Sequence, residues 1–214
     1  MTEGPITEGL RERKKRRTRQ TLSETAIALF LEHGFDRVSV ADVAAAAEVS
    51  KPTLFRYFPS KEDLVLHRIA DHQGEAAQVV RERAPDQPAV AALRAHFHAG
   101  LDNWEPVTGL CDIPAVAAFR DMLYTTPALV ARLPAYTAVD EQALAEALWQ
   151  TAGADELTAR LAAVQIIAVQ HLLARDNWRR LSGSRSREEM LREAHREADA
   201  AFGLLESGLS RQLR

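Results

Sequence analysis

Between Lys51 and Tyr57, this 214-residue chain carries several side chains of the kinds that bind nucleic acids. The ammonium of Lys51 and the guanidinium of Arg56 can pair with phosphates or with the acceptor atoms of guanine. The hydroxyls of Thr53 and Tyr57 can donate to phosphate oxygens, and the ring of Phe55 can touch a base. The same residues could also be the solvated face of an ordinary helix, so their role depends on the elements that carry them.

Two short helices joined by a turn are predicted in the segment VSVADVAAAAEVSKPTLFRYFPSKEDLVL, which begins at Val38. Ser39 is a favourable N-cap for the first helix, and Asp42 completes a capping box. Ser50 caps the second helix, where Pro52 lies in the first turn and its missing amide hydrogen costs little. Helices this short need a shared apolar seam, which we expect from Val43, Ala44, Ala47, Val49, Leu54 and Phe58. The pattern indicates a helix-turn-helix whose second helix turns its polar face to a DNA groove.

With these elements the sequence resembles the TetR family of transcriptional regulators. The resemblance also includes the apolar positions Leu22, Ala26, Leu29 and Phe30, the HGF turn that begins at His33, and the segment FPSKEDL. It implies an all-α fold, with an N-terminal three-helix DNA-binding domain and a larger C-terminal helical domain. It also implies that Lys51, Pro52 and Thr53 approach bases, that Phe55, Arg56 and Tyr57 touch bases or phosphates, and that Ser39 and Lys61 hold the DNA backbone.

Three residues depart from the family pattern. Glu48 occupies the turn position where the family usually has glycine, so we expect a left-handed backbone there at a cost of roughly 1–2 kcal/mol. Phe55 replaces a common tyrosine and loses a hydroxyl contact. Ala41, where some relatives carry a base-reading arginine, can at most touch a methyl group.

A basic run, RERKKRRTRQ, precedes the motif. Although the formal charge of the chain is −3, residues 1–70 carry 12 Lys and Arg against 10 Asp and Glu, so the positive charge is local. Like charges at this density oppose a stable helix, so we expect residues 1–17 to form a flexible arm. Arg16, Arg17 and Arg19 are expected to contact DNA, and the alternative is a solvated helix extension without a partner. The helix-turn-helix domain is then 18–66, and the effector and dimerisation domain is 67–214.

Composition places the remainder in the all-α class, because Ala, Leu, Glu and Arg dominate and no strand alternation occurs. Cys111 is the single cysteine, which fits a reducing cytoplasm and an inert buried thiol. Neither a signal peptide nor an apolar stretch of membrane length is recognised, so no membrane partner is expected and the predicted location is cytoplasmic.

Helices are predicted at 60–83, 88–104 and 136–151, with a proline-rich middle of short helices between the last two. Two long helices close the chain, one from Asp155 to about Arg180 and one capped by Ser186 and Glu189 after an SGSRS loop. The first is apolar on two faces, one with Leu157, Leu161, Val164, Ala168 and Leu172, the other with Ala162, Ile166, Val169 and Leu173. In the family such a pair forms a four-helix interface between subunits, so we expect a homodimer that reads two half-sites, with packing inside one chain as the alternative.

A cavity for a small, largely apolar effector is predicted among the central helices, and a loose resemblance to regulators that sense acyl-CoA-like molecules points the same way. For each single candidate, ordinary core is the competing interpretation. The predicted ligand-binding residues are His96, Phe97, Trp104, Phe119, Met122, Leu123, Trp149, Gln165, His171 and Trp178.

An enzyme is the rival class, but the chain has no GxSxG, P-loop, GxGxxG or HExxH motif. His96 and His98 are two apart and point to different sides of a helix, and His67 and His72 are five apart, so no metal site is predicted. We expect neither catalysis nor a cofactor. A constitutive DNA-binding protein without an effector remains the closer alternative to a ligand-responsive repressor.

Overall fold

The computed structural model describes residues 9–70, 72–181 and 186–209, and within them every regular element is helical. The chain divides into two compact units, each described by itself. Unit 1 comprises residues 1–71 and 119–131, and unit 2 comprises residues 72–118 and 132–214. Residues 119–131 thus join the N-terminal unit, although the division of the sequence at residue 66 assigned them to the C-terminal domain.

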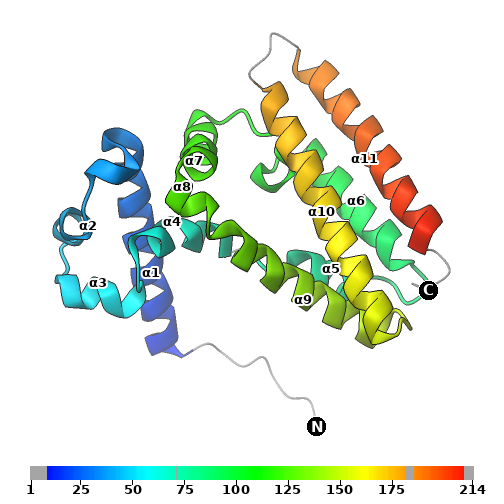
Figure 1. The fold of residues 1–214 in the computed structure, drawn as a ribbon, viewed down its shortest axis with the longest axis horizontal. Coiled ribbons are helices and arrows are strands. Elements are labelled where there is room, and N and C mark those ends of the chain that lie inside the picture. Colours follow the sequence, from blue (N-terminus) through cyan, green and yellow to red (C-terminus); the bar gives the residue numbers. More distant parts are fainter. Residues whose placement is uncertain (1–8, 71, 182–185, 210–214) are drawn as a thin grey trace. The chain divides into compact units, whose positions relative to one another are not determined.

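Unit 1 contains α1 (Leu10–His33), η1 (Phe35–Arg37), α2 (Val40–Ala46), α3 (Lys51–Tyr57), α4 (Lys61–Ala70) and α8 (Pro127–Val130). Figure 1 shows the two short helices α2 and α3 beside the long α1, which also packs against α4. The predicted seam forms, since Val43 and Leu54 are 0% exposed and Phe58 is 1% exposed. Ser23 on α1 donates its hydroxyl hydrogen to the carbonyl of Leu64 at 2.7 Å, which ties α1 to α4.

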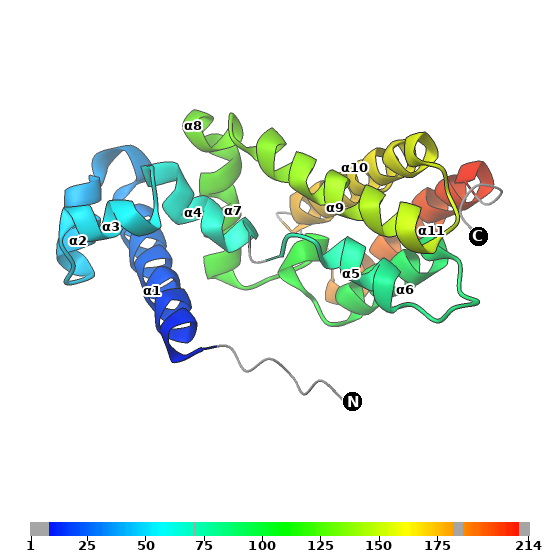
Figure 2. The same ribbon diagram turned by 90° about the horizontal axis from the view of Figure 1, so that it is seen from below.

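Unit 2 contains α5 (Glu75–Glu82), α6 (Ala89–Asp102), η2 (Pro106–Thr108), α9 (Leu133–Thr151), α10 (Glu156–Arg180) and α11 (Arg187–Leu209). The helix α7 (Pro114–Thr125) begins in unit 2 and ends in unit 1. In unit 2, α11 packs against both α6 and α10, and α9 runs along α10 (Figures 1 and 2). The core of unit 2 lies among these helices and includes Leu93, Leu148, Ile166 and Phe202.

Prolines begin two short helices of the middle region, since Pro106 is the first residue of η2 and Pro127 is the first residue of α8. The prolines that were expected to interrupt helices there therefore mark the positions where new helices start. Gly109 follows η2 with φ +84°, and a Cβ on it would lie 1.8 Å from the carbonyl oxygen of Ala174. Only glycine allows this approach of the loop to α10. Asn177, 1% exposed, completes the junction by donating to the carbonyl of Thr108 at 2.9 Å.

Two sequence predictions about helices were wrong. The helix expected over 60–83 is two helices, α4 and α5, because Gly74 adopts φ +80° and its amide donates to the carboxylate of Asp140 at 2.9 Å. The arm expected to be flexible is helical from Leu10 onward, as part of α1, where Lys15 pairs with Glu12 at 3.4 Å. Residues 1–8 of the arm, and most of the SGSRS loop, lie outside the described residues.

The two long closing helices form as expected. Asp155 caps α10 by accepting from the amide of Thr158 at 3.0 Å, and Ser186 and Glu189 form the capping box of α11. Within the described chain, α10 is the one helix that is long and apolar enough to cross a membrane, although no such stretch was expected. The core helix of a soluble protein meets the same two conditions, and Ala162, Ile166 and Leu173 are buried in unit 2.

Candidate nucleic-acid interface and ligand cavity

The second helix of the motif, α3, presents the residues predicted to bind DNA. Lys51, Pro52, Phe55 and Arg56 are exposed, while Leu54 on the opposite face is completely buried. Lys51 lies 5.9 Å from the ring centroid of Phe55, so cation and aromatic ring share one surface. The outer face of α3 therefore combines positive charge with a flat apolar ring, as a groove-binding helix requires.

The first turn of α3 is organised by two hydroxyls. Ser50 accepts from the amide of Thr53 at 3.2 Å, and the two hydroxyl oxygens are 2.8 Å apart. Thr53 is half-buried, and its hydroxyl already has this partner. A hydroxyl keeps further acceptor and donor capacity, so Thr53 can contact DNA only in the orientation that Ser50 allows.

Arg19 and Lys61, both predicted to contact DNA, have partners inside unit 1. Arg19 donates to the carbonyl of Tyr57 at 3.3 Å, and its guanidinium lies 5.3 Å from the ring centroid of Phe58. The ammonium of Lys61 donates to the carbonyl of Phe35 and lies 4.3 Å from the centroid of the Phe35 ring. The two cations therefore position the end of α3 and the turn η1, and any contact with phosphate would be additional.

At the start of α2, Ser39 and Asp42 form the predicted capping box. The amide and the hydroxyl of Ser39 donate to the carboxylate of Asp42 at 2.8 and 2.7 Å, and the amide of Asp42 donates to the Ser39 hydroxyl at 3.2 Å. The Ser39 hydrogen bonds hold the pKa of Asp42 below its ordinary value. Ser39 remains exposed, so it can meet a phosphate while it caps the helix.

The turn between α2 and α3 has the strained backbone expected of it. Glu48 adopts φ +54°, in the left-handed region that glycine occupies without strain. The turn is closed by a hydrogen bond from the amide of Val49 to the carbonyl of Ala44 at 2.9 Å. The packing of α2 against α3 thus maintains a conformation that Glu48 itself disfavours.

Arg16 and Arg17 are exposed on α1, ahead of the part of the helix that packs against α2 and α4. Being helical, these residues project from a defined scaffold. The basic charge that was assigned to a mobile arm is therefore attached to the same helix that supports the motif.

A cavity of about 100 Å³ lies within unit 2, between α5, α6, η2, α9 and α10. Of the ten residues predicted to bind a ligand, His96, Phe97 and His171 line it. The other residues that form its wall are His72, Glu75, Ala76, Gly100, Glu105, Val107, Thr108, Asp140, Ile167 and Gln170. Ionisable and polar side chains supply many of these residues, while apolar atoms make up most of the surface of the wall.

Glu75 is the electrostatic centre of the cavity. One of its carboxylate oxygens lies 2.9 Å from Nε2 of His96, and the other lies 3.7 Å from Nδ1 of His72. Hydrogen bonds from His72 and His96 lower the pKa of Glu75 to about 2. The Glu75 carboxylate in turn raises the pKa of His96. Burial raises the pKa of Asp140, another wall residue, although the Gly74 amide opposes that shift.

Seven predicted ligand residues lie outside this cavity. Gln165 is exposed and donates to the carbonyl of Leu161 on its own helix at 3.0 Å, and Trp149 is 55% exposed. Trp104 lies under the guanidinium of Arg187, 3.9 Å from its ring centroid, and Trp178 is half-buried. The remaining three, Phe119, Met122 and Leu123, are buried residues that belong to unit 1.

The helical phase explains the place of Gln165, because it shares a face of α10 with apolar residues that are also exposed. Leu157, Leu161, Val164 and Leu172 are 64%, 55%, 47% and 50% exposed. The other apolar face of α10 is buried within unit 2. An open groove of about 670 Å³ beside the exposed face is lined by Trp149, Arg160 and Val164 among others. Unit 2 therefore leaves uncovered one of the two faces that the sequence predicted to be covered.

Sequence reasoning missed Glu75, Asp140 and His72 as wall residues. Glu75 and Asp140 occur among other charged residues on amphipathic helices, where charge usually means solvent exposure. Only the break between α4 and α5 at Gly74 brings the first turn of α5 against α9, and the glycine itself was visible in the sequence.

Within the described chain, no three metal-ligating side chains converge. The thiol of Cys111 is buried, at 2% exposure.

Comparison with known proteins gives a consistent result. Residues 22–67 match the family model described as bacterial regulatory proteins, tetR family. The chain is 30% identical to the transcriptional repressor LfrR of Mycolicibacterium smegmatis over 152 residues, which cover 69% of this chain and 70% of that protein. It is 37% identical to the transcriptional regulator TcmR of Streptomyces glaucescens over 93 residues, which cover 44% of this chain and 41% of that protein.

Solved structures share the fold at lower sequence identity. Salmonella enterica GusR superposes with a TM-score of 0.55 at 22% identity, over 97% of this chain and all of that one. A TetR-family regulator from Streptomyces coelicolor A3 superposes with a TM-score of 0.53 at 21% identity, over 94% and 99% of the two chains. The helical arrangement described above is therefore that of known regulators.

Proposed function

Because this chain belongs to the TetR family of bacterial regulatory proteins, we propose that it is a homodimeric repressor that binds a near-palindromic operator and releases it when a small molecule binds unit 2. The exposed cationic and aromatic face of α3 is the observation that carries the proposal. Since operator DNA lies in the cytoplasm of a bacterium, the protein acts there. No catalytic role is proposed.

We propose that Lys51, Phe55 and Arg56 contact bases or phosphates directly, since they are exposed on α3. Pro52, Thr53 and Tyr57 lie on the same short helix and complete the surface. Ser39, Arg16 and Arg17 add phosphate contacts from α2 and α1, while Arg19 and Lys61 act mainly by holding α3 and η1 in place.

The test of DNA binding is a gel-shift titration of the purified protein against an operator found by genome-wide footprinting. Replacing Arg56 with alanine should cost on the order of 1–3 kcal/mol, which is a loss of about 5- to 150-fold in affinity. Arg81→Ala on α5 removes the same charge from an exposed position outside α3, α10 and α11, and should change the affinity little. Equal affinities of the two variants at matched salt would remove α3 from the interface.

Dimerisation is proposed through the exposed face of α10 together with α11. Four large apolar residues exposed along one helix are more than a monomer usually leaves in water. Small residues on the outer side of α11, Ala200 and Gly203, allow a second helix to come close. Two copies joined this way can place their recognition helices about one turn of DNA apart, roughly 34–36 Å, or a multiple of it.

We propose the cavity around Glu75 as the effector site. A volume of about 100 Å³ suits a small molecule better than a long acyl chain, and the ionisable wall favours a ligand with polar groups. The wall begins at His72, two residues after α4 ends, so a ligand there acts on the segment that links α4 to α5. Coupling of about 1–3 kcal/mol would weaken operator binding roughly 5- to 150-fold.

The test of the effector site is a cavity-filling variant. Ala76→Leu should leave operator binding intact and abolish release by any compound that a thermal-shift screen identifies. Ala95→Leu, at an exposed position of α6, is the matched control and should respond as the parent does. If no compound releases the parent protein from its operator, the alternative of a constitutive DNA-binding protein is favoured instead.

A further inference from the structure

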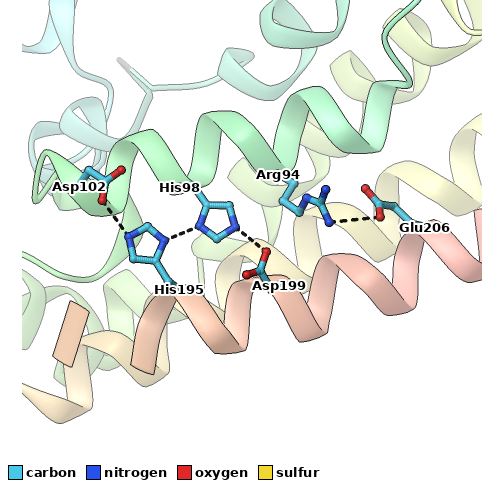
Figure 3. Close-up of polar contacts among 6 residues, drawn as sticks. All are labelled: Arg94, His98, Asp102, His195, Asp199 and Glu206. Carbon is cyan, nitrogen blue, oxygen red and sulfur yellow. Dashed lines mark hydrogen bonds and ion pairs between the residues drawn. The ribbon is translucent and has the colours of Figure 1, made fainter. Parts of the chain in front are cut away.

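Two histidines from distant parts of the sequence meet in unit 2, between α6 and α11. Nδ1 of His98 lies 2.5 Å from Nδ1 of His195, as Figure 3 shows. The two side chains are 21% and 28% exposed, so solutes can reach them. This pair lies outside the cavity wall around Glu75 and outside the motif that binds DNA.

Each histidine is anchored at its other nitrogen by a carboxylate. Nε2 of His98 lies 3.0 Å from Asp199, and Nε2 of His195 lies 2.8 Å from Asp102 (Figure 3). A carboxylate accepts only, so each Nε2 must carry a hydrogen. Both Nδ1 atoms are thereby left to use their lone pairs.

The two lone pairs point at each other. The two ring planes differ by only 7°. The ring centroids are 4.8 Å apart, and this distance is longer than the 2.5 Å between the two Nδ1 atoms by about the width of one imidazole ring. The nitrogens therefore lie between the rings, head to head. Two lone pairs at this distance repel unless a positive species lies between them, either a shared proton or a metal ion.

We propose that His98 and His195 form a binding site for a divalent d-block cation of the Zn²⁺ or Ni²⁺ class, with Asp102 and Asp199 as its positioning residues. Imidazole nitrogen is a preferred ligand of these ions. A histidine that ligates a metal almost always donates its second ring hydrogen to a carboxylate or similar acceptor, and both histidines do so here.

The coordination requires the two rings to separate and tilt, and it requires two further ligands. Tetrahedral zinc with bonds of about 2.0–2.1 Å needs its two nitrogens about 3.3 Å apart, at an angle of about 109° at the metal. The rings must therefore separate by about 0.8 Å, and each must tilt by roughly 35° out of the head-to-head line. Within the described chain no third metal-ligating side chain converges on the pair, so water completes the shell. The ion lies between the two Nδ1 atoms, and each of these nitrogens supplies one lone pair to it.

A bound ion would link α6 to α11 beside a contact that already joins them. Arg94, one turn before His98, pairs with Glu206 of α11 at 3.3 Å (Figure 3). At about 100 times its dissociation constant, an ion that binds only the folded protein shifts the folding equilibrium about 100-fold. The site thus predicts metal-dependent stability in unit 2.

The experiment is a calorimetric titration of ZnCl₂, and separately NiCl₂, into the untagged full-length protein after treatment with chelator. One ion per chain should bind, with a heat signal that saturates. His98→Gln and His195→Gln should each abolish this binding, and Asp199→Asn should weaken it by 10- to 100-fold. His33→Gln, at an exposed histidine of α1, is the matched control and should bind as the parent does.

A second measurement does not depend on how well the variants fold. Long-range ¹H–¹⁵N spectra of the parent protein should show Nδ1 of two histidines shifting together when zinc is added. Binding that survives both histidine substitutions would overturn the proposal. So would the absence of saturable binding to the parent, since the pair would then hold a proton only.

Discussion

The carboxylate of Glu75 and the imidazole of His96 stabilise each other's charged forms. Because the pKa of His96 is raised, its protonated form adds stability that is complete below the unfolded value near 6.5 and is lost as pH rises through the raised value. Because the pKa of Glu75 is lowered to about 2, its contribution is present above 4.5 and is lost as pH falls toward 2. The pair therefore contributes most between these limits.

Replacing Glu75 with glutamine should lower the pKa of His96, because the amide cannot supply the negative charge. An NMR titration of the His96 ring protons in both proteins measures this directly. Glu82→Gln, at an exposed position on the same helix, should leave the titration of His96 unchanged. A His96 titration that is identical in Glu75→Gln and the parent would show that the two side chains do not interact in solution.

Replacing Glu48 with glycine is expected to stabilise the protein, because Glu48 has a left-handed backbone. Its φ of +54° costs roughly 1–2 kcal/mol for a residue with a Cβ, and glycine removes that strain while losing about 0.5–1 kcal/mol of backbone entropy. Glu48→Gly should therefore raise the free energy of unfolding by roughly 0.5–1 kcal/mol. Urea denaturation gives the value. The control Glu48→Gln keeps the Cβ and should gain nothing, and a loss of stability in the glycine variant would contradict the argument.

Arg16 and Arg17, near the amino-terminal end of α1, are expected to contribute to the salt dependence of DNA binding. If Arg16 and Arg17 each neutralise one phosphate, then replacing both with glutamine should reduce the slope of log affinity against log salt by about 1.8 for duplex DNA. Gel shifts across a series of salt concentrations measure this slope. A double variant that keeps the slope of the parent would show that these arginines are solvated.

The helix α10 illustrates how one element serves two surfaces. Its buried face packs in unit 2 through Ala162 and Ile166, and its other face leaves Leu161 and Leu172 exposed. The position of Gln165 along the helix therefore determines that its side chain is exposed, and the polarity of its amide does not. Since Gln165 lies on the exposed face, we expect its substitution to change the association of subunits more than it changes the binding of an effector.

At the scale of the whole molecule, operator binding and dimerisation should be lost together. A charged Leu161→Glu on the exposed face of α10 should convert the dimer to monomers, because the carboxylate would be buried against a second copy. The operator affinity should then fall by about 100-fold or more, since two half-sites no longer act jointly. Sedimentation and gel shifts measure both effects. Ile113→Glu, at an exposed apolar residue before α7, is the control and should remain dimeric.

Residue types and their spacing were enough to predict the all-α class, the helix-turn-helix, its capping residues and the left-handed Glu48. These features depend on interactions between residues that are close in the chain, such as Ser39 with Asp42 and Ser50 with Thr53. Local hydrogen bonds and apolar periodicity can be read from residue types and spacing alone.

Which side chains share a cavity or a cluster could not be predicted in this way, because it depends on how the helices pack. Glu75 meets His96 across 21 residues, and His98 meets His195 across 97, because packed helices bring together positions whose separation carries no periodic signal. The same packing leaves Gln165 on the surface and assigns Arg19 to the end of α3. Such contacts follow from how helices pack against one another, which no local pattern in the chain records.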